Sequence, residues 1–311
     1  MNGGARLAVD IGGTFTDVVL EHDGGQSSLK LLTTPAAPER AVLDGIGEIL
    51  NRTGVSASDV GLVIHGTTLA TNALIERKGA HTALLTTEGF RDSIEIAYEH
   101  RFEQYDLYME RPEPLVSREH RFTVPERLAA DGSVLMDLDE DALRALVAPL
   151  KAGKFEAIAI CFLHSYANDA HEVRARDILA AALPGVSITI SSDVCPEIRE
   201  YDRMSTTCAN AYVQPKMVGY LARLQDNLRQ NGLDCPLLLM MSSGGVTTVE
   251  TAIAKPIRLV ESGPAGGAIL ARDIARENDL TLALSFDMGG TTAKITLIDD
   301  FTPHIARSFE V

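Results

Sequence analysis

The stretch Asp10-Ile-Gly-Gly-Thr-Phe-Thr-Asp17 has a close counterpart later in the chain, Asp287-Met-Gly-Gly-Thr-Thr-Ala-Lys294. Each copy follows an apolar run and precedes another. Both therefore predict a strand, a Gly-Gly turn and a second strand, with an aspartate at the end of the first strand. A strand–turn–strand hairpin is also a common structural element. Two matched copies, each with an aspartate before the glycines and a threonine after them, favour a shared chemical role.

The chemistry of these turns suits a phosphate group. Paired glycines let backbone N–H groups approach phosphate oxygens with no Cβ atom in the way, and the threonines add hydroxyl donors. The aspartate of each turn is suited to hold Mg²⁺ through water molecules, or to orient an attacking oxygen. The sequence therefore predicts a pair of phosphate-binding hairpins and a nucleotide ligand.

Composition narrows the class of partner. The chain has 311 residues, of which 45% are hydrophobic, and a formal net charge of −15. This length allows about two domains, and the negative charge gives no electrostatic footprint for nucleic acid or an anionic membrane surface. The longest apolar run, 157–163, is too short to span a bilayer, and the N-terminus lacks the pattern of a signal peptide. We expect a soluble, cytoplasmic protein whose four cysteines (Cys161, Cys195, Cys208 and Cys235) are reduced thiols.

Predicted helices and strands alternate along the chain, which is typical of an α/β fold whose strands lead into catalytic loops. The stretch 98–128 carries prolines among charged and aromatic residues, and we expect it to be a long irregular excursion with a functional role. Apolar spacing predicts helices at about 38–52, 139–151, 169–182 and 201–231, and strands at about 61–64, 82–86, 155–163, 186–190 and 236–241.

Small residues are concentrated just ahead of the second hairpin. Glu261-Ser-Gly-Pro-Ala-Gly-Gly-Ala268 opens a predicted helix that continues to about residue 275. Small side chains let two helices approach closely, which suits a hinge between two domains. The same residues also suit an ordinary helix N-terminus with proline at its first position.

This order of elements resembles the superfamily of actin, sugar kinases and heat-shock chaperones, in which two related domains close over ATP. Within it, the chain is similar to the hydantoinase A/5-oxoprolinase family, which includes N-methylhydantoinases and acetone-carboxylase-type subunits. The matching motifs cover nearly the whole chain, and they are specific for the family but much less so for a substrate. They are Asp10–Asp17, His65-Gly-Thr-Thr-Leu-Ala-Thr-Asn-Ala-Leu-Ile-Glu-Arg77, Gly89-Phe-Arg-Asp92, Glu200-Tyr-Asp-Arg-Met-Ser-Thr-Thr207, Asn210-Ala-Tyr-Val213, Ser262-Gly-Pro-Ala-Gly-Gly267 and Asp287-Met-Gly-Gly-Thr-Thr292.

The resemblance implies an α/β fold with an actin-like, ribonuclease-H-like ATPase domain I, in which helices flank a mixed sheet, and only the first strands of domain II. The expected divisions are an N-terminal domain at 1–262, a hinge helix at 263–280 and the start of the second ATPase domain at 281–311. A second domain of so few strands has open edges, which favour self-association as a homo-oligomer. We therefore expect a fragment, a truncated product or half of a split enzyme that is inactive by itself.

The resemblance also implies an activity, which is ATP-dependent activation of a carbonyl. The γ-phosphoryl group would go onto a cyclic amide such as a hydantoin or 5-oxoproline to allow ring opening, with a B-type hydantoinase subunit as partner. ATP and Mg²⁺ are the implied cofactors, with Asp10 and Asp287 as catalytic and Mg²⁺-binding residues. Lys294 either neutralises phosphate charge or points to solvent. The expected phosphate contacts are Gly12, Gly13, Thr14, Thr16, Gly289, Gly290, Thr291 and Thr292.

Two further groups of residues are candidates for substrate binding. His65, Gly66, Thr67 and Thr68 lie where a predicted strand meets a predicted helix, so their N–H groups and hydroxyls can face an anion or a polarised carbonyl. A helix N-cap needs the same residue types, and His65 is equally consistent with a structural histidine. The second group, Arg91 and Asp92 together with Arg199, Asp202 and Arg203, either lines the substrate cleft or forms surface ion pairs.

Other functions compete with ring opening. ATP-dependent carboxylation of a ketone shares the same activation step. A non-catalytic nucleotide-binding or chaperone-like module belongs to a different class, and so does a remnant that only dimerises. The His65–Thr68 motif and the 98–128 excursion favour an enzyme, because a nucleotide switch needs no second small-molecule pocket.

Overall fold

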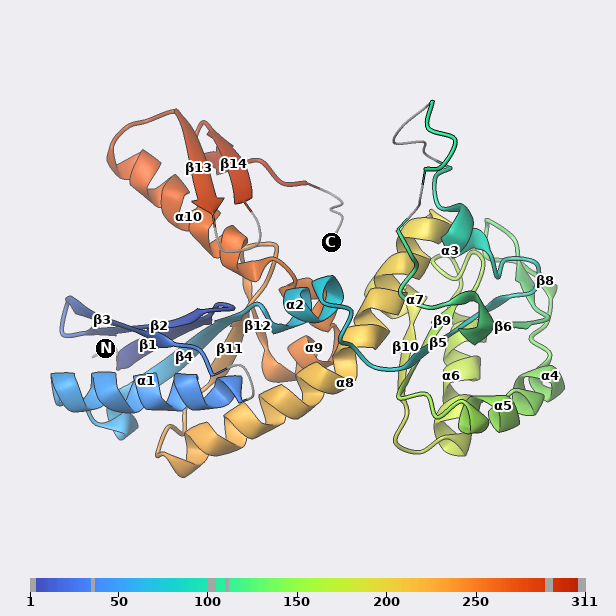
Figure 1. Ribbon diagram of the computed structural model, residues 1–311, viewed down its shortest axis with the longest axis horizontal. Coiled ribbons are helices and arrows are strands. Elements are labelled where there is room, and N and C mark those ends of the chain that lie inside the picture. Colours follow the sequence, from blue (N-terminus) through green and yellow to red (C-terminus); the bar gives the residue numbers. More distant parts are fainter. Residues whose placement is uncertain (1–3, 35–36, 100–104, 110–111, 289–292, 307–311) are drawn as a thin grey trace. The chain divides into compact units, whose positions relative to one another are not determined.

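The computed structural model of the protein describes residues 4–34, 37–99, 105–109, 112–288 and 293–306. The chain forms two compact units (Figure 1). Unit 1 consists of residues 1–76 and 217–311, and unit 2 of residues 77–216. This division differs from the expected one, because a separate unit is inserted within the first 262 residues and the second hairpin belongs to the same unit as the first.

Unit 1 is built on a six-stranded mixed sheet with the order β12-β11-β4-β1-β2-β3. Strands β1, β4 and β11 run parallel, whereas β2, β3 and β12 pair in antiparallel fashion. The side chains of β1 alternate strictly between buried and exposed, as expected for a strand with one face on the core. The six strands are β1 (Ala5–Ile11), β2 (Phe15–His22), β3 (Gly25–Leu32), β4 (Val60–Thr67), β11 (Leu237–Met240) and β12 (Val246–Thr248).

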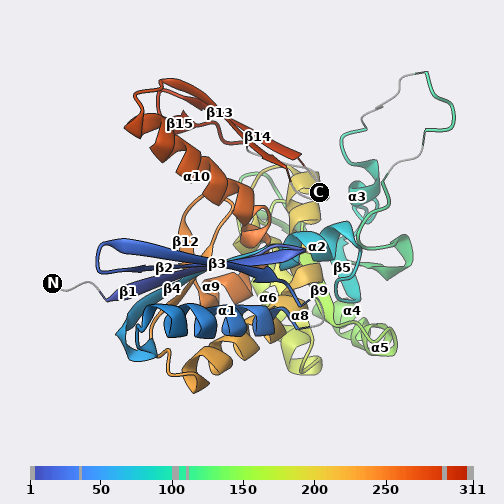
Figure 2. The same ribbon diagram turned by 60° about the vertical axis from the view of Figure 1, so that its left-hand side comes forward.

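Helix α1 (Pro38–Thr53) covers one face of β1, β2 and β3 (Figures 1 and 2). It begins with a proline in its first turn and ends at Gly54, whose φ of 75° is left-handed, a common way to end a helix. Gly45 allows the close approach of helix and sheet, because a Cβ atom there would come within 2.7 Å of Val18 Cγ2. The two strands that flank the first predicted Gly-Gly turn, β1 and β2, therefore pack against α1 in a hydrophobic core.

The second hairpin lies in a small antiparallel sheet with the order β13-β14-β15. Helix α10 (Ser262–Glu277) packs beside it in both views (Figures 1 and 2). The strands are β13 (Leu282–Met288), β14 (Ala293–Asp299) and β15 (Thr302–Pro303).

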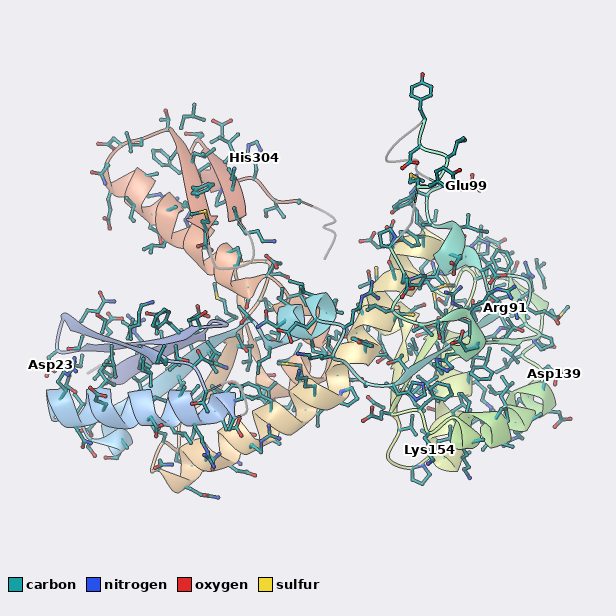
Figure 3. All side chains as sticks on the ribbon, in the orientation of Figure 1. Asp23, Arg91, Glu99, Asp139, Lys154 and His304 are labelled. Atoms are coloured by element: carbon teal, nitrogen blue, oxygen red, sulfur yellow. The ribbon has the colours of Figure 1, made fainter. Side chains whose placement is uncertain are left out.

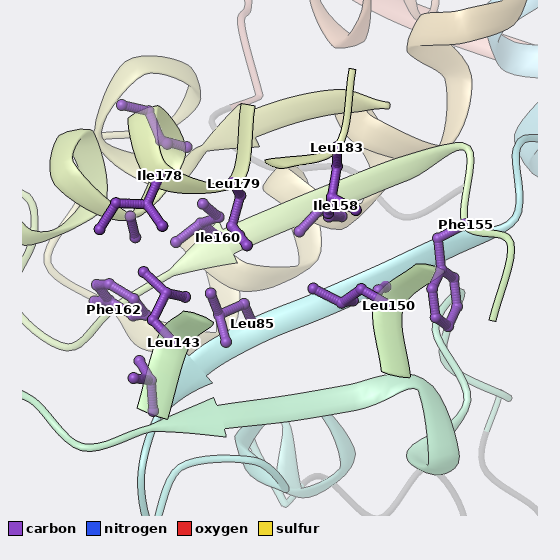
Figure 4. Packing of buried hydrophobic residues seen from close by; sticks show 14 residues of the cluster. Leu85, Leu143, Leu150, Phe155, Ile158, Ile160, Phe162, Ile178, Leu179 and Leu183 are labelled. Carbon is purple, nitrogen blue, oxygen red and sulfur yellow. The ribbon is translucent and has the colours of Figure 1, made fainter. Parts of the chain in front are cut away.

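Unit 2 contains a parallel sheet with the order β10-β9-β5-β6. Every residue of β5 and β9 is buried, as expected for a parallel sheet with both faces covered. One face packs against α4, α5 and α6, and Figure 4 shows Leu143, Leu150 and Leu179 meeting Leu85 and Ile160 there. The elements are β5 (Thr82–Thr87), β6 (Arg121–Val124), β9 (Ala157–Cys161), β10 (Ser187–Ile190), α4 (Glu140–Ala145), α5 (Val147–Ala152) and α6 (Ala170–Ala182).

The longest helix, α8 (Glu200–Gln230), contains Pro215, and the division between the units falls after residue 216. Shorter elements complete the two units. They are the α-helices α2 (Leu69–Ile75), α3 (Ser93–Ile96), α7 (Ser191–Val194) and α9 (Val249–Ala254), the 3₁₀ helices η1 (Ala57–Asp59), η2 (Arg118–His120) and η3 (Pro256–Leu259), and the strands β7 (Arg127–Leu128) and β8 (Val134–Met136).

Two expectations from apolar spacing need correction. The predicted helix at 139–151 is two helices, α4 and α5, in succession. The stretch 98–128 is not irregular throughout, because it contains β6, which pairs with β5 in the central sheet of unit 2. Among the helices that the structure describes, none combines the length and the apolar composition needed to cross a membrane.

Candidate functional site

Asp10 lies near the end of β1, between its neighbours on two other strands. It pairs with Asp17 on β2 and with Gly66 on β4. A Cβ atom on Gly66 would come within 2.5 Å of Asp10 Oδ1, so a larger residue at this position would displace the carboxylate. The structure therefore brings Gly66, an expected substrate residue, against the expected catalytic aspartate.

Negative charge accumulates around the Asp10 carboxylate. Burial of that carboxylate and the charges of Asp17 and Asp287 raise the pKa of Asp10, whereas the ammonium of Lys30 opposes them. Lys30 itself pairs with Asp17, at 2.8 Å between Nζ and Oδ1. The two hairpin aspartates are thus close enough to interact, and one cation of the chain only partly offsets three carboxylates.

The turn between β1 and β2 presents backbone and a hydroxyl to open space. The Gly12 N–H group donates to the Phe15 carbonyl at 2.9 Å, which closes the turn. Next to Gly13, the atom nearest to the place of a Cβ is Asn72 Nδ2, at 4.0 Å. Thr14 is exposed. Gly13 and Thr14 are therefore placed to meet an anion, whereas Gly12 shapes the turn.

Thr16, unlike Thr14, is not exposed at this turn. It is completely buried, and its hydroxyl lies 2.9 Å from Thr33 Oγ1, which donates in turn to the Gly12 carbonyl at 3.0 Å. The expectation that the Thr16 side chain contacts phosphate is therefore wrong for this structure. Thr16 and Thr33 instead stabilise the turn through the hydrogen bond to the Gly12 carbonyl.

His65 is a structural histidine. Its ring is buried on β4, with Nδ1 at 3.1 Å from the Val9 carbonyl and Nε2 at 2.7 Å from the Tyr220 hydroxyl. These partners require Nδ1–H to donate to Val9 and the Tyr220 hydroxyl to donate to Nε2. Burial lowers the pKa of His65 to about 4. Because both ring nitrogens are engaged inside the protein, the expected substrate contact through this side chain is corrected to a packing role.

Thr67 and Thr68 join the end of β4 to α2. The Thr67 hydroxyl accepts the Leu69 N–H group at 3.2 Å, which satisfies a backbone donor at the start of the helix. The Thr68 hydroxyl donates to the Ile11 carbonyl at 3.1 Å and lies 3.3 Å from Asn72 Nδ2. Both threonines therefore hold α2 beside the first turn.

The second hairpin reaches the same region through Glu261. Lys294 Nζ lies 2.9 Å from Glu261 Oε2, so this partly exposed side chain is engaged in an ion pair. The Glu261 N–H group donates to Thr71 Oγ1 at 3.1 Å, and the residue has a left-handed φ of 64°. Asp287 lies on β13, opposite Lys294 on β14. The expected phosphate contacts Gly289, Gly290, Thr291 and Thr292 lie outside the described residues.

Arg91 and Asp92 belong to unit 2, where Figure 3 labels Arg91. Arg118 holds both carboxylate oxygens of Asp92, through Nε and Nη2 at 3.0 Å each. The Arg118 guanidinium lowers the pKa of Asp92. Asp92 is thus part of an ion-pair cluster, which matches the alternative weighed for it.

Arg203, a further candidate, is fully buried in unit 2. Its Nη1 and Nη2 atoms donate to the carbonyls of Glu197 and Phe162, both at 2.8 Å, and its Nε atom donates to Ser191 Oγ at 3.2 Å. A guanidinium with three internal acceptors stabilises the start of α8. All three of these donor atoms are therefore engaged inside unit 2.

Sequence reasoning missed several residues of the first hairpin. Asp17 is part of the motif but has no predicted role. Lys30 lies on β3, a strand that no motif indicates, and Thr33 directly follows that strand. Cross-strand register was the missing signal, because Asp10, Asp17 and Lys30 form one row across three strands. Glu261 was read only as the start of a small-residue helix.

The residues present fit a nucleotide phosphate with Mg²⁺. Within the described ranges, no group of three histidine, cysteine, aspartate or glutamate side chains is arranged to hold a metal ion alone. Mg²⁺ commonly binds through one or two carboxylates together with water and substrate phosphates. Asp10, with its raised pKa and its acidic neighbours, offers such a carboxylate next to open glycine backbone.

Comparison with known proteins identifies the family. Residues 6–183 match the hydantoinase/oxoprolinase N-terminal region, and residues 203–311 match the hydantoinase/oxoprolinase family model. The chain belongs to the hydantoinase/oxoprolinase family. Its mixed α/β fold, with sheets flanked by helices, is that of the crystal structure of ATP-dependent caprolactamase from Pseudomonas jessenii. The TM-score is 0.85 at 35% identity, covering 94% of this chain and 43% of that one.

Curated members of the family resemble this chain over nearly its whole length. Caprolactamase subunit alpha of Pseudomonas jessenii is 35% identical over 94% of this chain and 43% of its own length. The acetophenone carboxylase gamma subunit of Aromatoleum aromaticum is 30% identical over 94% and 42%, respectively. The 5-oxoprolinase of Saccharomyces cerevisiae is 30% identical over 96% and 26%. The chain thus spans less than half the length of these relatives.

Proposed function

We propose that this chain is the phosphate-binding part of an ATP-dependent enzyme that activates a cyclic amide carbonyl for ring opening. The observation that carries the proposal is the charge around Asp10. A carboxylate held against Asp17 and Asp287, with its pKa raised, weakens the fold unless a cation joins it. Such a costly arrangement beside an open glycine turn is characteristic of a functional site.

Each residue of the first hairpin has a distinct part in this proposal. ATP bound with Mg²⁺ supplies the phosphoryl group and the charge that the carboxylates lack. Asp10 would hold the cation directly or through water, and Asp17, with Lys30 as its counter-ion, adds negative charge beside Asp10. The Gly13 backbone and the Thr14 hydroxyl donate to phosphate oxygens. Catalysis of this kind depends mainly on positioning and charge neutralisation.

The second hairpin would complete the site from the other side. Asp287 contributes the second carboxylate, and we assign phosphate contacts to residues 289–292 on the strength of the repeated motif. Lys294 neutralises phosphate charge only by exchanging its Glu261 partner for the ligand. Gly66 and the backbone between Thr67 and Thr68 border Asp10, and we assign them to the carbonyl-binding side.

The substrate is a cyclic amide in this proposal, because the relatives include a caprolactamase and a 5-oxoprolinase. Ketone carboxylation is the second candidate, favoured by the similarity to an acetophenone carboxylase subunit. Two of these relatives are named as subunits. We therefore propose that the complete protein works with a partner subunit of the B type.

Nucleotide binding tests the first part of the proposal. We expect calorimetry to show Mg²⁺-dependent binding of ATP that Asp10→Asn weakens at least tenfold. The same substitution should leave the unliganded fold intact or raise its stability by roughly 0.2–1 kcal/mol, because it removes a like charge from a cross-strand pair. Asp23→Asn is the matched control, since Asp23 is fully exposed in the next turn of the same sheet. Equal ATP affinity in Asp10→Asn and the control would contradict the proposal.

Substrate choice needs the protein assembled with its partner. Phosphate release should be stimulated by 5-oxoproline, caprolactam or hydantoin if the enzyme opens rings. Stimulation by a ketone with bicarbonate, and by none of the ring compounds, would assign it to the carboxylases instead.

A further inference from the structure

Unit 2 contains an open cavity of about 530 Å³ that is separate from the hairpin residues. It forms where the chain enters β5 and β9, from the segments 77–82 and 113–120, with Glu156 and Tyr212 completing the wall. Nothing in the proposed chemistry at Asp10 uses these residues. The lining nevertheless includes charged and polar side chains that can bind a polar ligand, among them Arg77 and Glu156.

The cavity carries both signs of charge. Arg77 Nη2 donates to the Glu113 carbonyl at 2.6 Å, and among the described residues Arg77 has no carboxylate partner. Glu156 accepts the His81 N–H group through Oε2 at 2.9 Å, which leaves Oε1 for another donor. A cation and an anion in the same cavity that are not paired with each other favour a ligand carrying the two opposite charges.

The wall of the cavity is held in place by packing. A Cβ atom on Gly79 would lie 2.1 Å from Tyr212 Cδ1, so the Tyr212 ring packs directly on this backbone, and the Ala80 N–H group donates to the Tyr212 carbonyl at 2.8 Å. The His81 and His120 rings lie 4.7 Å apart and both contact Phe155. A site built from fixed backbone and packed rings loses little entropy when a ligand binds.

We propose that this cavity binds a zwitterionic amino acid, with Arg77 receiving the carboxylate and Glu156 the ammonium group. The choice of amino acid, the product of ring opening, rests on the proposed function. Hydrolysis of a lactam breaks the C–N bond, and water gives a hydroxyl to carbon and a hydrogen to nitrogen. The product then carries one carboxylate and one amine. The cavity is therefore a binding site for ring-opened product that is lined by residues of unit 2.

Binding of defined probes to the full chain tests this site without ATP. The probes are 6-aminohexanoate and glutamate, compared by calorimetry with hexanoate, which lacks the amine, and hexylamine, which lacks the carboxylate. We expect at least one amino acid to bind at least tenfold more tightly than either single-charge compound. No binding of either amino acid, or hexanoate binding as tightly as 6-aminohexanoate, would overturn the zwitterion assignment.

Matched variants locate the binding. Arg77→Gln and Glu156→Gln should each weaken amino-acid binding at least tenfold, and glutamine at 156 keeps an oxygen that accepts from His81. Arg127→Gln is the control, because Arg127 also donates to a backbone carbonyl, that of Glu88, but lies outside the cavity. Unchanged affinity in Arg77→Gln, or an equal loss in Arg127→Gln, would refute the site. Because no step needs nucleotide, amino-acid binding that persists when ATP binding fails would separate this proposal from the proposed function.

Discussion

The two hairpins share a motif but differ in what covers them. Counted from the aspartate of each motif, the same positions carry large apolar side chains in both. In the first hairpin Leu7, Val9, Val18 and Leu20 are all at most 2% exposed. In the second, the corresponding residues Leu284, Phe286, Ile295 and Leu297 are 63%, 58%, 62% and 38% exposed.

This difference comes from the neighbouring elements. Helix α1 packs on β1, β2 and β3, whereas α10 packs on the opposite face of the second hairpin, where Ala283, Ser285 and Ile298 are less exposed (Figure 2). The charges differ as well. Asp10 pairs across its hairpin with Asp17, but Asp287 pairs with Lys294. The motif thus determines the turn, and the neighbouring residues determine whether its carboxylate faces a like charge or an opposite one.

The largest expected effect comes from truncating the same position in both hairpins. Leu7→Ala should cost about 2–5 kcal/mol of unfolding free energy, because it leaves a cavity in a packed core. Leu284→Ala should change stability by less than about 0.5 kcal/mol, because its side chain is already in solvent. Urea unfolding of the two variants measures both. A comparable loss in Leu284→Ala would show that this face is covered in solution, and the contrast between the hairpins would disappear.

A second feature of the first hairpin is a buried histidine, His65, on the neighbouring strand β4. The pKa of His65 is lowered to about 4 in the folded chain, so below its ordinary value near 6.5 only the unfolded chain takes up the proton. The free energy of unfolding should therefore fall by about 1.4 kcal/mol per pH unit from pH 6.5 to 4, roughly 3 kcal/mol in all.

Unfolding by urea at a series of pH values tests this expectation. In His65→Asn the slope between pH 6.5 and 4 should be smaller by the contribution of one proton, although the variant is less stable overall. His304→Asn is the control in the other hairpin region, since His304 is exposed (Figure 3). An unchanged slope in His65→Asn would contradict the burial of a neutral imidazole.

Much of this architecture was predictable from the chain alone, and the failures have physical causes. Apolar spacing located α1, α6 and α8, and continuous apolar runs located β5 and β9, whose residues are all buried. It missed β6, whose four residues carry too short a pattern, and it joined α4 to α5 across Leu146, the residue between them. Residue type singled out the hairpin carboxylates as candidate ligands of Mg²⁺, and this assignment stays a prediction. It could not show that Thr16 and His65 face inward, because side-chain direction depends on register and on the distant partners Thr33 and Tyr220.

A smaller effect concerns the row Asp10–Asp17–Lys30. Asp10 must be ionised to attract Mg²⁺, so ATP affinity should rise as the pH rises through its raised pKa. Asp17→Asn removes one of the charges that raise this pKa, and the increase in affinity should then occur at lower pH. Asp44→Asn on the exposed side of α1 is the control. Calorimetric titrations between pH 4 and 7 measure the shift, and coincident profiles for Asp17→Asn and wild type would contradict the coupling.

The smallest effect probes how each hairpin is fastened. Lys294→Met removes the ion pair with Glu261, and Lys30→Met removes the pair with Asp17, so the same substitution is made once in each hairpin. Partly exposed ion pairs contribute about 0–1 kcal/mol. The second hairpin lies in a three-stranded sheet with one exposed apolar face, so its amides at 293–298 should lose about two- to fivefold of their hydrogen-exchange protection. The first is held within a six-stranded sheet, so amides at 15–20 should keep theirs in Lys30→Met. Equal loosening of both hairpins would mean that the six-stranded sheet adds nothing to the stability of the first one. The ion pairs, rather than the neighbouring strands, would then hold each hairpin in place.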